Sequence, residues 1–233
     1  MRHLRLLLLA LTLSLPAAAW AQRSAVVVEL FTSQGCSSCP PADAILAEIA
    51  ARPDVIALAL HVDYWDYLGW TDPFGKAAHT ARQRGYAKKV RQRSVYTPQM
   101  IVQGVDRVVG ADHDAVAAFV SAHQARPAPV ALRAQRHGRA LRIRLAPLIP
   151  VAVGPSDVYV VRYLPGGTML IEHGENAGWT ADFVNVVTDW SAVAQWDGAA
   201  EAELAVELPD AGPVAVIVQR ERLGPILAAA KLP

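Results

Sequence analysis

The stretch Val26–Pro41, VVVELFTSQGCSSCPP, indicates how the first half of the chain folds. Its opening run, Val26–Phe31, is apolar and largely β-branched except for Glu29, a pattern typical of a strand buried on both faces. A polar turn follows, and then Cys36 and Cys39 with two prolines directly behind them. Proline is tolerated in the first turn of a helix but breaks its interior. We therefore predict a strand, a turn that carries both cysteines, and a helix that begins near Cys36.

The two cysteines are the only ones in the chain, and they stand three positions apart. Disulfides that stabilise secreted proteins tend to close long loops, because the entropy removed from the unfolded chain grows with loop length. A Cys36–Cys39 bridge would contribute about 2 kcal/mol at best. We therefore interpret it as a redox-active disulfide, which requires no bound cofactor. A helix N-terminus lowers the pKa of a thiol to roughly 3.5–7.5, so Cys36 is expected to be the exposed attacking sulfur and Cys39 the buried resolving one.

Further elements of the first half follow from the apolar pattern. They are a second buried strand over residues 55–62, a helix over 74–93 with a basic outer face, a hairpin with strands at 100–102 and 107–109, and a helix capped by Asp112. The resulting order is β-α-β-α-β-β-α. With the cysteine turn placed after the first strand, this order resembles the thioredoxin fold.

Thr97-Pro98 lies directly before the predicted hairpin and strengthens this resemblance. In the thioredoxin family, a cis-proline preceded by a small or β-branched residue packs against the redox pair. The resemblance implies that Pro98 is cis and that the backbone before it pairs with a substrate chain. It also implies that these two residues join Cys36 and Cys39 in the catalytic site. Gly35 and the inner Ser-Ser pair depart from the Trp-Cys-Gly-Pro-Cys of thioredoxins, which leaves the direction of electron transfer open.

The buried acid of thioredoxins lies on the first strand, and Glu29 is its nearest counterpart in this sequence. Glu29 is offset by one residue from the matching position, and side chains alternate between the two faces of a strand. Glu29 is a candidate proton acceptor for Cys39, a role that requires the turn to compensate for the offset.

Two longer stretches narrow the resemblance to one bacterial family. They are VELFTSQGCSSCPPAD at residues 28–43 and HVDYWDYLGW at residues 61–70. Both are similar to the exported thioredoxin-like family known as domain of unknown function 1223, and the likeness covers almost all of the chain after residue 21. The resemblance implies a thioredoxin-like fold and a redox motif, and it implies no particular substrate.

The aromatic stretch over residues 61–70 allows two interpretations. One is a substrate groove at the carboxyl ends of the strands, where open α/β sheets bind ligands. Its candidate residues are His61, Asp63, Trp65 and Trp70. In the other interpretation the aromatic rings cover the sheet and His61 caps the end of a strand.

The cysteine pair predicts a thiol–disulfide oxidoreductase whose partners are protein or small-molecule thiols and disulfides. One alternative is a copper or zinc site, because Cys36, Cys39 and His61 offer two soft sulfur ligands and an imidazole. A closed zinc site takes four ligands, and the chain has no second cysteine pair. The other alternative is a non-enzymatic binding module with a permanent Cys36–Cys39 bridge.

The N-terminus has the three parts of a secretory signal peptide at residues 1–21. Arg2 and Arg5 form a positive start, residues 6–15 form an apolar run too short to span a bilayer, and Ala19-Trp20-Ala21 forms a cleavage site. Its removal changes the formal net charge from +1 to −1, so no general attraction to nucleic acid or anionic lipid is expected. We predict an exported protein, periplasmic or secreted, with no stable membrane insertion after cleavage.

The second half of the chain has a different pattern, which begins after Arg126-Pro127-Ala128-Pro129. Predicted strands cover residues 130–136, 141–145, 157–163, 169–173, 202–208 and 214–220, and a helix-like segment follows at 223–231. Alternating short strands at this spacing indicate a β-sandwich. The predicted fold class is therefore an α/β thioredoxin-like domain, residues 22–126, followed by an all-β sandwich-like C-terminal domain, residues 127–233.

One glycine-rich loop in the second half, Gly174–Trp179, allows two roles. In the first, the loop reaches across to the redox pair. In the second, it is a hairpin loop whose tryptophan packs at the interface between the domains, and we favour this packing role.

Overall fold

The fold is described from a computed structural model, which covers residues 24–149 and 153–233. The predicted signal peptide, residues 1–21, lies outside the described residues. Among the described residues, no helix has both the length and the apolar character needed to cross a membrane.

Strands predominate in the described part of the chain. The first half contains β1 (Val26–Thr32), α1 (Pro40–Ala50), β2 (Val55–His61), the 3-10 turn η1 (Asp66–Leu68), α2 (Ala77–Lys89), β3 (Gln99–Val102), β4 (Asp106–Val109) and α3 (His113–Gln124). The second half contains β5 (Val130–His137), β6 (Ala140–Pro147), β7 (Ser156–Leu170), β8 (Thr180–Trp196), β9 (Ala202–Glu207), β10 (Val214–Arg220) and β11 (Ile226–Leu232).

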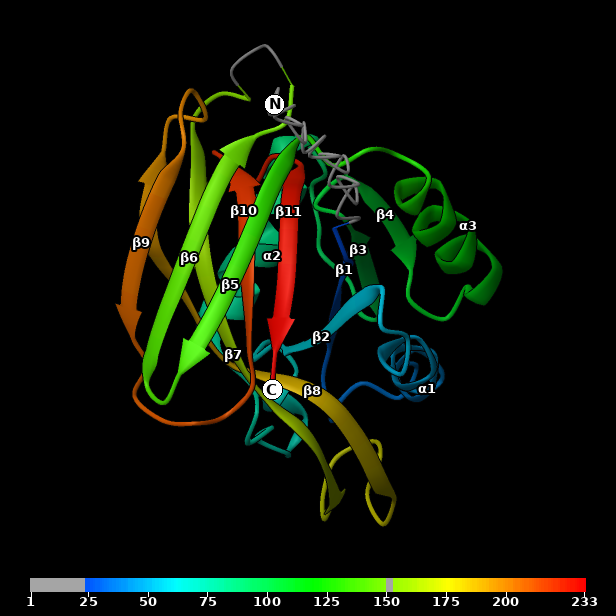
Figure 1. The fold of residues 1–233 in the computed structure, drawn as a ribbon. Coiled ribbons are helices and arrows are strands. Elements are labelled where there is room, and N and C mark those ends of the chain that lie inside the picture. The colour runs from blue at the N-terminus through cyan, green and yellow to red at the C-terminus, as the bar shows by residue number, and fades with distance from the viewer. Residues whose placement is uncertain (1–23, 150–152) are drawn as a thin grey trace, which may run out of the picture.

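One large mixed sheet joins the two halves of the chain, in the strand order β11-β10-β7-β8-β2-β1-β3-β4. β1 and β2 pair in parallel from Val26↔Val55 to Thr32↔His61, and β8 pairs in parallel with β2 at Ala59↔Val186. The predicted fold class, an α/β thioredoxin-like domain followed by an all-β sandwich-like domain, is therefore wrong. The protein is mostly β, because strands from both halves share one eight-stranded sheet that few helices cover (Figure 1).

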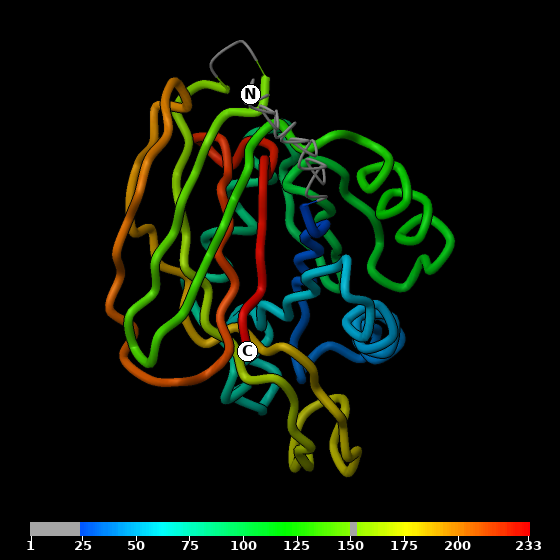
Figure 2. The backbone as a smooth tube through the Cα atoms, viewed as in Figure 1, coloured from blue at the N-terminus to red at the C-terminus, as the bar shows by residue number. Residues whose placement is uncertain are grey.

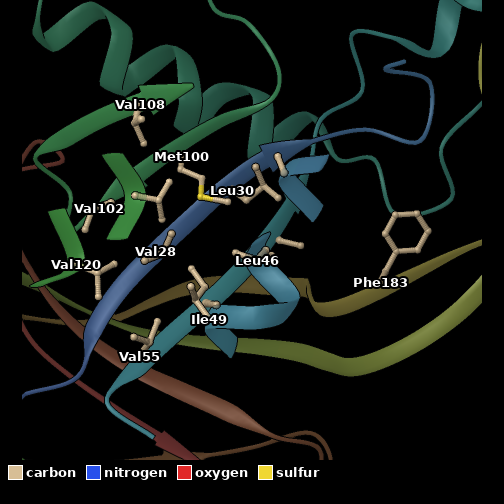
Figure 3. Packing of buried hydrophobic residues seen from close by; sticks show 14 of the residues in the cluster. Val28, Leu30, Leu46, Ile49, Val55, Met100, Val102, Val108, Val120 and Phe183 are labelled. Carbon is tan, nitrogen blue, oxygen red and sulfur yellow. The ribbon is translucent and has the colours of Figure 1, made fainter. Parts of the chain in front are cut away.

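Helices cover the N-terminal half of this sheet on both faces. α1 and α3 pack on one face, where Leu46 and Ile49 meet Val28 and Leu30 of β1 (Figure 3). On the opposite face, Tyr86 of α2 packs in a second apolar cluster. Burying an apolar side chain of this size contributes about 1.5–3 kcal/mol. The two clusters therefore hold β1 and β2 rigidly, and the segments that follow these strands start from a fixed position.

The C-terminal half of the large sheet packs against a second, three-stranded sheet of order β5-β6-β9. The apolar layer between them includes Leu141 and Ile143 from the small sheet and Val158, Val160 and Val216 from the large one. The path of the chain through both layers can be followed in Figure 2. The sandwich-like layer thus exists, but one of its two sheets also contains the strands of the first half.

The structure differs from the prediction at three places in the second half. The strand predicted at 157–163 and the start of the one predicted at 169–173 belong to one continuous strand, β7, which ends at Leu170. Strand β8 was not predicted at all. Most of the segment predicted as helix-like at 223–231 instead forms strand β11, which runs to Leu232. Its alanines favour a helix by local propensity, but pairing with β10 from Val214↔Leu232 to Gln219↔Ile226 overrides that preference.

Candidate functional site

The two cysteines lie at the start of α1 and are joined in a disulfide with a Cα–Cα distance of 5.4 Å. Cys39 is the N-cap residue, so α1 begins at Pro40 rather than near Cys36. Pro40 and Pro41 carry no N–H group, and the amide of Ala42 donates to the Cys39 carbonyl at 2.9 Å. The sulfurs therefore lie at the positive end of the helix dipole, but the first two helical residues offer them no amide donors.

Pro98 lies beside this end of α1. The peptide bond between Thr97 and Pro98 is cis, and the Pro98 carbonyl accepts a hydrogen bond from the Gly110 amide at 2.9 Å. A methyl group added at Gly110 would lie 3.0 Å from the Cβ of Ala42 and 3.1 Å from the Cβ of Pro98. Pro98 and the first turn of α1 are therefore neighbours, and the fold brings the sequence-predicted Thr97-Pro98 to the helical turn that directly follows the cysteine pair.

A buried glutamine of α2 holds the loop around Pro98. Gln83 donates to the Tyr96 carbonyl at 2.7 Å and to the Gln99 side chain at 3.0 Å. Its side-chain oxygen accepts from the hydroxyl of Tyr64 at 3.1 Å, and burial raises the pKa of Tyr64 to about 12. Tyr64 therefore stays a hydrogen-bond donor at neutral pH, and both sides of Pro98 are tied to one helix.

The loop between β7 and β8 covers the disulfide. Cys36 is 1% exposed and Cys39 is fully buried, so the prediction that Cys36 is exposed is wrong. The side-chain amide of Asn176 donates to the carbonyls of Gln34 at 2.8 Å and Cys36 at 3.0 Å. Trp179 remains 40% exposed. The loop at 174–179 therefore reaches the cysteine pair, and the packing role that we favoured for its tryptophan is wrong.

The carboxylate nearest in sequence to the cysteines is Asp43, on α1 and one helical turn after Cys39. Residues four apart on a helix lie on the same face. The hydroxyl of Thr32 donates to the Asp43 carboxylate at 3.0 Å. Burial raises the pKa of Asp43 from 3.8 to about 6, although the nearby His61 opposes the rise. Asp43 can therefore exchange a proton near neutral pH. We did not single it out from the sequence, where its helical spacing from Cys39 was the available signal.

Glu29 does not lie near Cys39. It is fully buried and bound by Arg82, with Nε 2.5 Å from the carboxylate, and by the hydroxyl of Tyr86 at 2.7 Å. Its neighbours Val28 and Leu30 pack in the α1 cluster, so the alternation of the strand directs Glu29 to the opposite face. The one-residue offset noted in the sequence is therefore not compensated.

His61 lies beneath the site rather than in a surface groove. It is fully buried, its Nδ1 is 2.7 Å from a carboxylate oxygen of Asp72, and its ring makes edge contacts with those of Phe74 and Phe183. The same Asp72 oxygen accepts from the Gln34 amide at 2.8 Å. Burial alone would raise the pKa of Asp72, but these hydrogen bonds hold it below its usual value. Asp72 thus ties the end of β2 to the turn that leads to Cys36.

The three other candidates for a substrate groove do not all lie at the site. Trp65 donates to the Thr97 hydroxyl at 2.7 Å, and Trp70 donates to the Gln34 side chain at 2.8 Å, so both border the cysteine pair. Asp63 instead accepts from Thr80 of α2 at 2.5 Å. The structure therefore brings two of the four candidates to the edge of the site.

Of the alternative metal ligands, the sulfurs of Cys36 and Cys39 are bonded to each other. Nδ1 of His61 faces Asp72, and its Nε2 is buried without a hydrogen-bond partner among the described residues. Within residues 24–149 and 153–233, no cluster of three or more histidine, cysteine or acidic side chains is arranged to hold a metal ion.

We expect Asp43→Asn to be more stable than the parent protein at pH 8 and nearly equal to it at pH 4. Because the folded-state pKa of Asp43 is raised to about 6 from 3.8, the stability that depends on its protonation is lost as the pH rises through 6. At pH 8, above both pKa values, the asparagine should therefore stabilise by about 3 kcal/mol. Urea unfolding at both pH values measures the difference, and Glu201→Gln, at an exposed position, is the control. If the free energy of unfolding at pH 8 rises no more in Asp43→Asn than in the control, the raised pKa of Asp43 is contradicted.

A family model described as "Protein of unknown function (DUF1223)" matches residues 27–219. The X-ray crystal structure of protein AGR_C_4864 from Agrobacterium tumefaciens is similar with a TM-score of 0.78 and 32% identity, over 91% of this chain and 95% of that one. HBP35 of Porphyromonas gingivalis shares the fold, with a TM-score of 0.60 and 13% identity over 90% of this chain and 75% of that one. No curated protein matches the chain.

Proposed function

Because this chain belongs to the DUF1223 family of proteins of unknown function, we propose its function from the site itself: it is a thiol–disulfide oxidoreductase that uses Cys36 and Cys39. Its partners are protein or small-molecule thiols and disulfides. The observation that carries this proposal is a disulfide at the N-terminus of α1 with Pro98 packed beside the same helical turn. A pair that closes so small a ring is better explained by chemistry than by stability.

We propose that the redox centre alone, and not the fold, is of the thioredoxin type. The support is local and consists of the cysteine pair, the neighbouring Thr97-Pro98 and their common position at the end of a helix. The signal-like residues 1–21 support an exported protein, periplasmic or secreted. Disulfides persist in those compartments.

The proposed reaction transfers two electrons in two exchange steps. In the reduced protein, the Cys36 thiolate attacks one sulfur of a substrate disulfide, whose S–S bond breaks, and the leaving sulfur takes up a proton. Cys39 then loses its proton and attacks Cys36, which restores the Cys36–Cys39 bond and releases the second substrate thiol. The substrate is reduced and the protein is oxidised, and the same steps run in reverse with a substrate dithiol. Asp43, one helical turn from Cys39, is suited to accept the Cys39 proton.

The covering loop must move for this reaction to occur. Cys36 is almost completely buried, and Asn176 bonds to its carbonyl oxygen. A substrate sulfur needs an in-line approach to Cys36, so the tip of the β7–β8 hairpin has to leave that position. Two side-chain hydrogen bonds to backbone oxygens hold Asn176 there, each worth about 1 kcal/mol. The free energy needed to open the β7–β8 loop is therefore small relative to the stability of the sheet.

A permanent bridge in a non-enzymatic binding module is the second candidate function. The observation that favours it is the burial of both sulfurs. In that case the disulfide fixes the turn between β1 and α1, and the protein acts through a surface elsewhere.

The reduction potential of the pair separates the two candidates. We expect a value between about −270 and −120 mV, the range of catalytic pairs of this kind. The protein is equilibrated in glutathione buffers of known potential, its free thiols are alkylated, and the reduced fraction is counted by mass spectrometry. A potential below about −300 mV, typical of structural disulfides, would favour the permanent bridge and overturn the oxidoreductase.

A further inference from the structure

A strongly basic groove lies next to the loop that carries Pro98. It has a volume of about 740 Å³ and is formed by the C-terminal part of α2 and the segment that follows it. Its lining includes four basic side chains, Arg84, Lys88, Arg91 and Arg93, together with Tyr64 and Val95.

The cations of this groove have no acidic partners. Arg84, Lys88, Arg91 and Arg93 are all exposed, and across residues 24–149 and 153–233 none of them forms an ion pair. The sequence contains no Asp or Glu between Asp72 and Asp106. Like charges this close repel one another, and the groove therefore has a locally positive potential although the net charge of the chain is only +1.

The groove lies close to the redox centre, because two of its lining residues are near neighbours in the chain of residues at that centre. Val95, in its wall, stands two residues before Thr97. Tyr64, which also lines the groove, precedes Trp65, which donates to the Thr97 hydroxyl. A Cβ added at Gly35 would lie 3.3 Å from the Cβ of Trp65, so the residue next to Tyr64 lies against the turn that leads to Cys36. A chain bound in the groove therefore needs only to pass Thr97 to reach the disulfide.

We propose that this basic groove binds an acidic segment of a polypeptide substrate while a cysteine of the same polypeptide exchanges with Cys36. This inference rests on the proposed function, to which it adds the substrate class. The groove favours a chain over a membrane surface because it is hollow and because Val90 is the only large apolar side chain of the segment 84–94 that is strongly exposed. Peripheral membrane binding instead combines basic residues with a broad apolar face.

The test compares two peptide disulfides that differ only in charge. Each peptide carries one cysteine in a mixed disulfide with a chromogenic thiol, flanked by glutamates in one peptide and by lysines in the other. We expect the reduced protein to react about 10-fold faster with the acidic peptide at low salt, and the ratio to approach one as salt rises. The variant Arg84→Glu/Arg93→Glu should lose or invert this preference. The same charge change at an exposed arginine of the remote three-stranded sheet, Arg142→Glu, should keep it.

The outcomes separate this inference from the proposed function. One outcome is that the acidic and basic peptides react at equal rates while the neutral 2-hydroxyethyl disulfide is reduced normally. That result would overturn the proposal that the groove binds acidic segments and would leave the proposed oxidoreductase function unaffected. If no disulfide reacts, the oxidoreductase fails, and fluorescence anisotropy of a labelled glutamate-rich peptide without cysteine still tests the groove. A third outcome is that the protein binds phosphatidylglycerol vesicles, that Arg84→Glu/Arg93→Glu abolishes this binding, and that the two peptides react equally fast. This result would show that the groove binds a lipid surface, and it would overturn the proposal.

Discussion

Replacement of Cys36 by serine is expected to lower the rate of disulfide exchange by at least about 10³-fold, because the residue that forms the covalent intermediate is lost. Cys39→Ser should behave differently. Its Cys36 still attacks the substrate disulfide, but no second sulfur resolves the product. Cys39→Ser should therefore accumulate a mixed disulfide with the chromogenic peptide, visible as a mass increase that a reductant reverses.

The two cysteine variants control for each other. Both lack the bridge, so each should lose the same stability, about 2 kcal/mol at most, and their unfolding midpoints in urea should agree. Only the fate of the substrate distinguishes them. The assigned roles of attacking and resolving sulfur would be wrong if both variants formed the mixed disulfide to the same extent. They would also be wrong if neither variant formed it under conditions where the parent protein is reduced.

Replacement of Glu29 by glutamine is expected to lower the free energy of unfolding by about 3–5 kcal/mol. The change keeps the shape of the side chain but leaves the guanidinium of Arg82, which is only 8% exposed, without its counter-ion. The remaining contacts of Arg82 include hydrogen bonds to Gln219 and to the Tyr86 hydroxyl, both at 3.0 Å, and the ring of Trp190, 3.8 Å from the guanidinium carbon to the ring centroid. None of these contacts neutralises the buried positive charge.

Urea unfolding at pH 7 measures this loss, and an exposed ion pair supplies the control. Asp54→Asn removes the partner of Arg52 in a pair whose side chains are 51% and 42% exposed, and it should cost less than about 1 kcal/mol. If Glu29→Gln costs no more than this, the buried pair does not hold α2 to the sheet. The exchange rate of the folded variant should stay unchanged, whereas a proton acceptor for Cys39 at this position would make it fall.

The local parts of the site could be predicted from sequence. The apolar run that precedes Cys36 forms a fully buried strand, and the prolines after Cys39 occupy the first turn of α1. Both follow from interactions between residues close in the chain, namely burial of a continuous apolar run and the missing N–H of proline. The thioredoxin resemblance implied that Pro98 packs near the cysteine turn, and the structure places Pro98 beside α1. The fold class that the same resemblance implied is nevertheless wrong.

The sequence alone established that a cysteine turn follows a buried strand and opens a helix. Tertiary structure decided everything that depends on strand pairing over long distances. β8 lies between β7 and β2 and fuses the two halves into one sheet, and its hairpin brings Asn176 to a cysteine 140 residues away. Local patterns carry no information about such pairings, because any strand edge offers the same row of N–H and C=O groups. Only the packed molecule determines which edges meet, and hence that Glu29 faces Arg82 while Asp43 lies on the helix of Cys39.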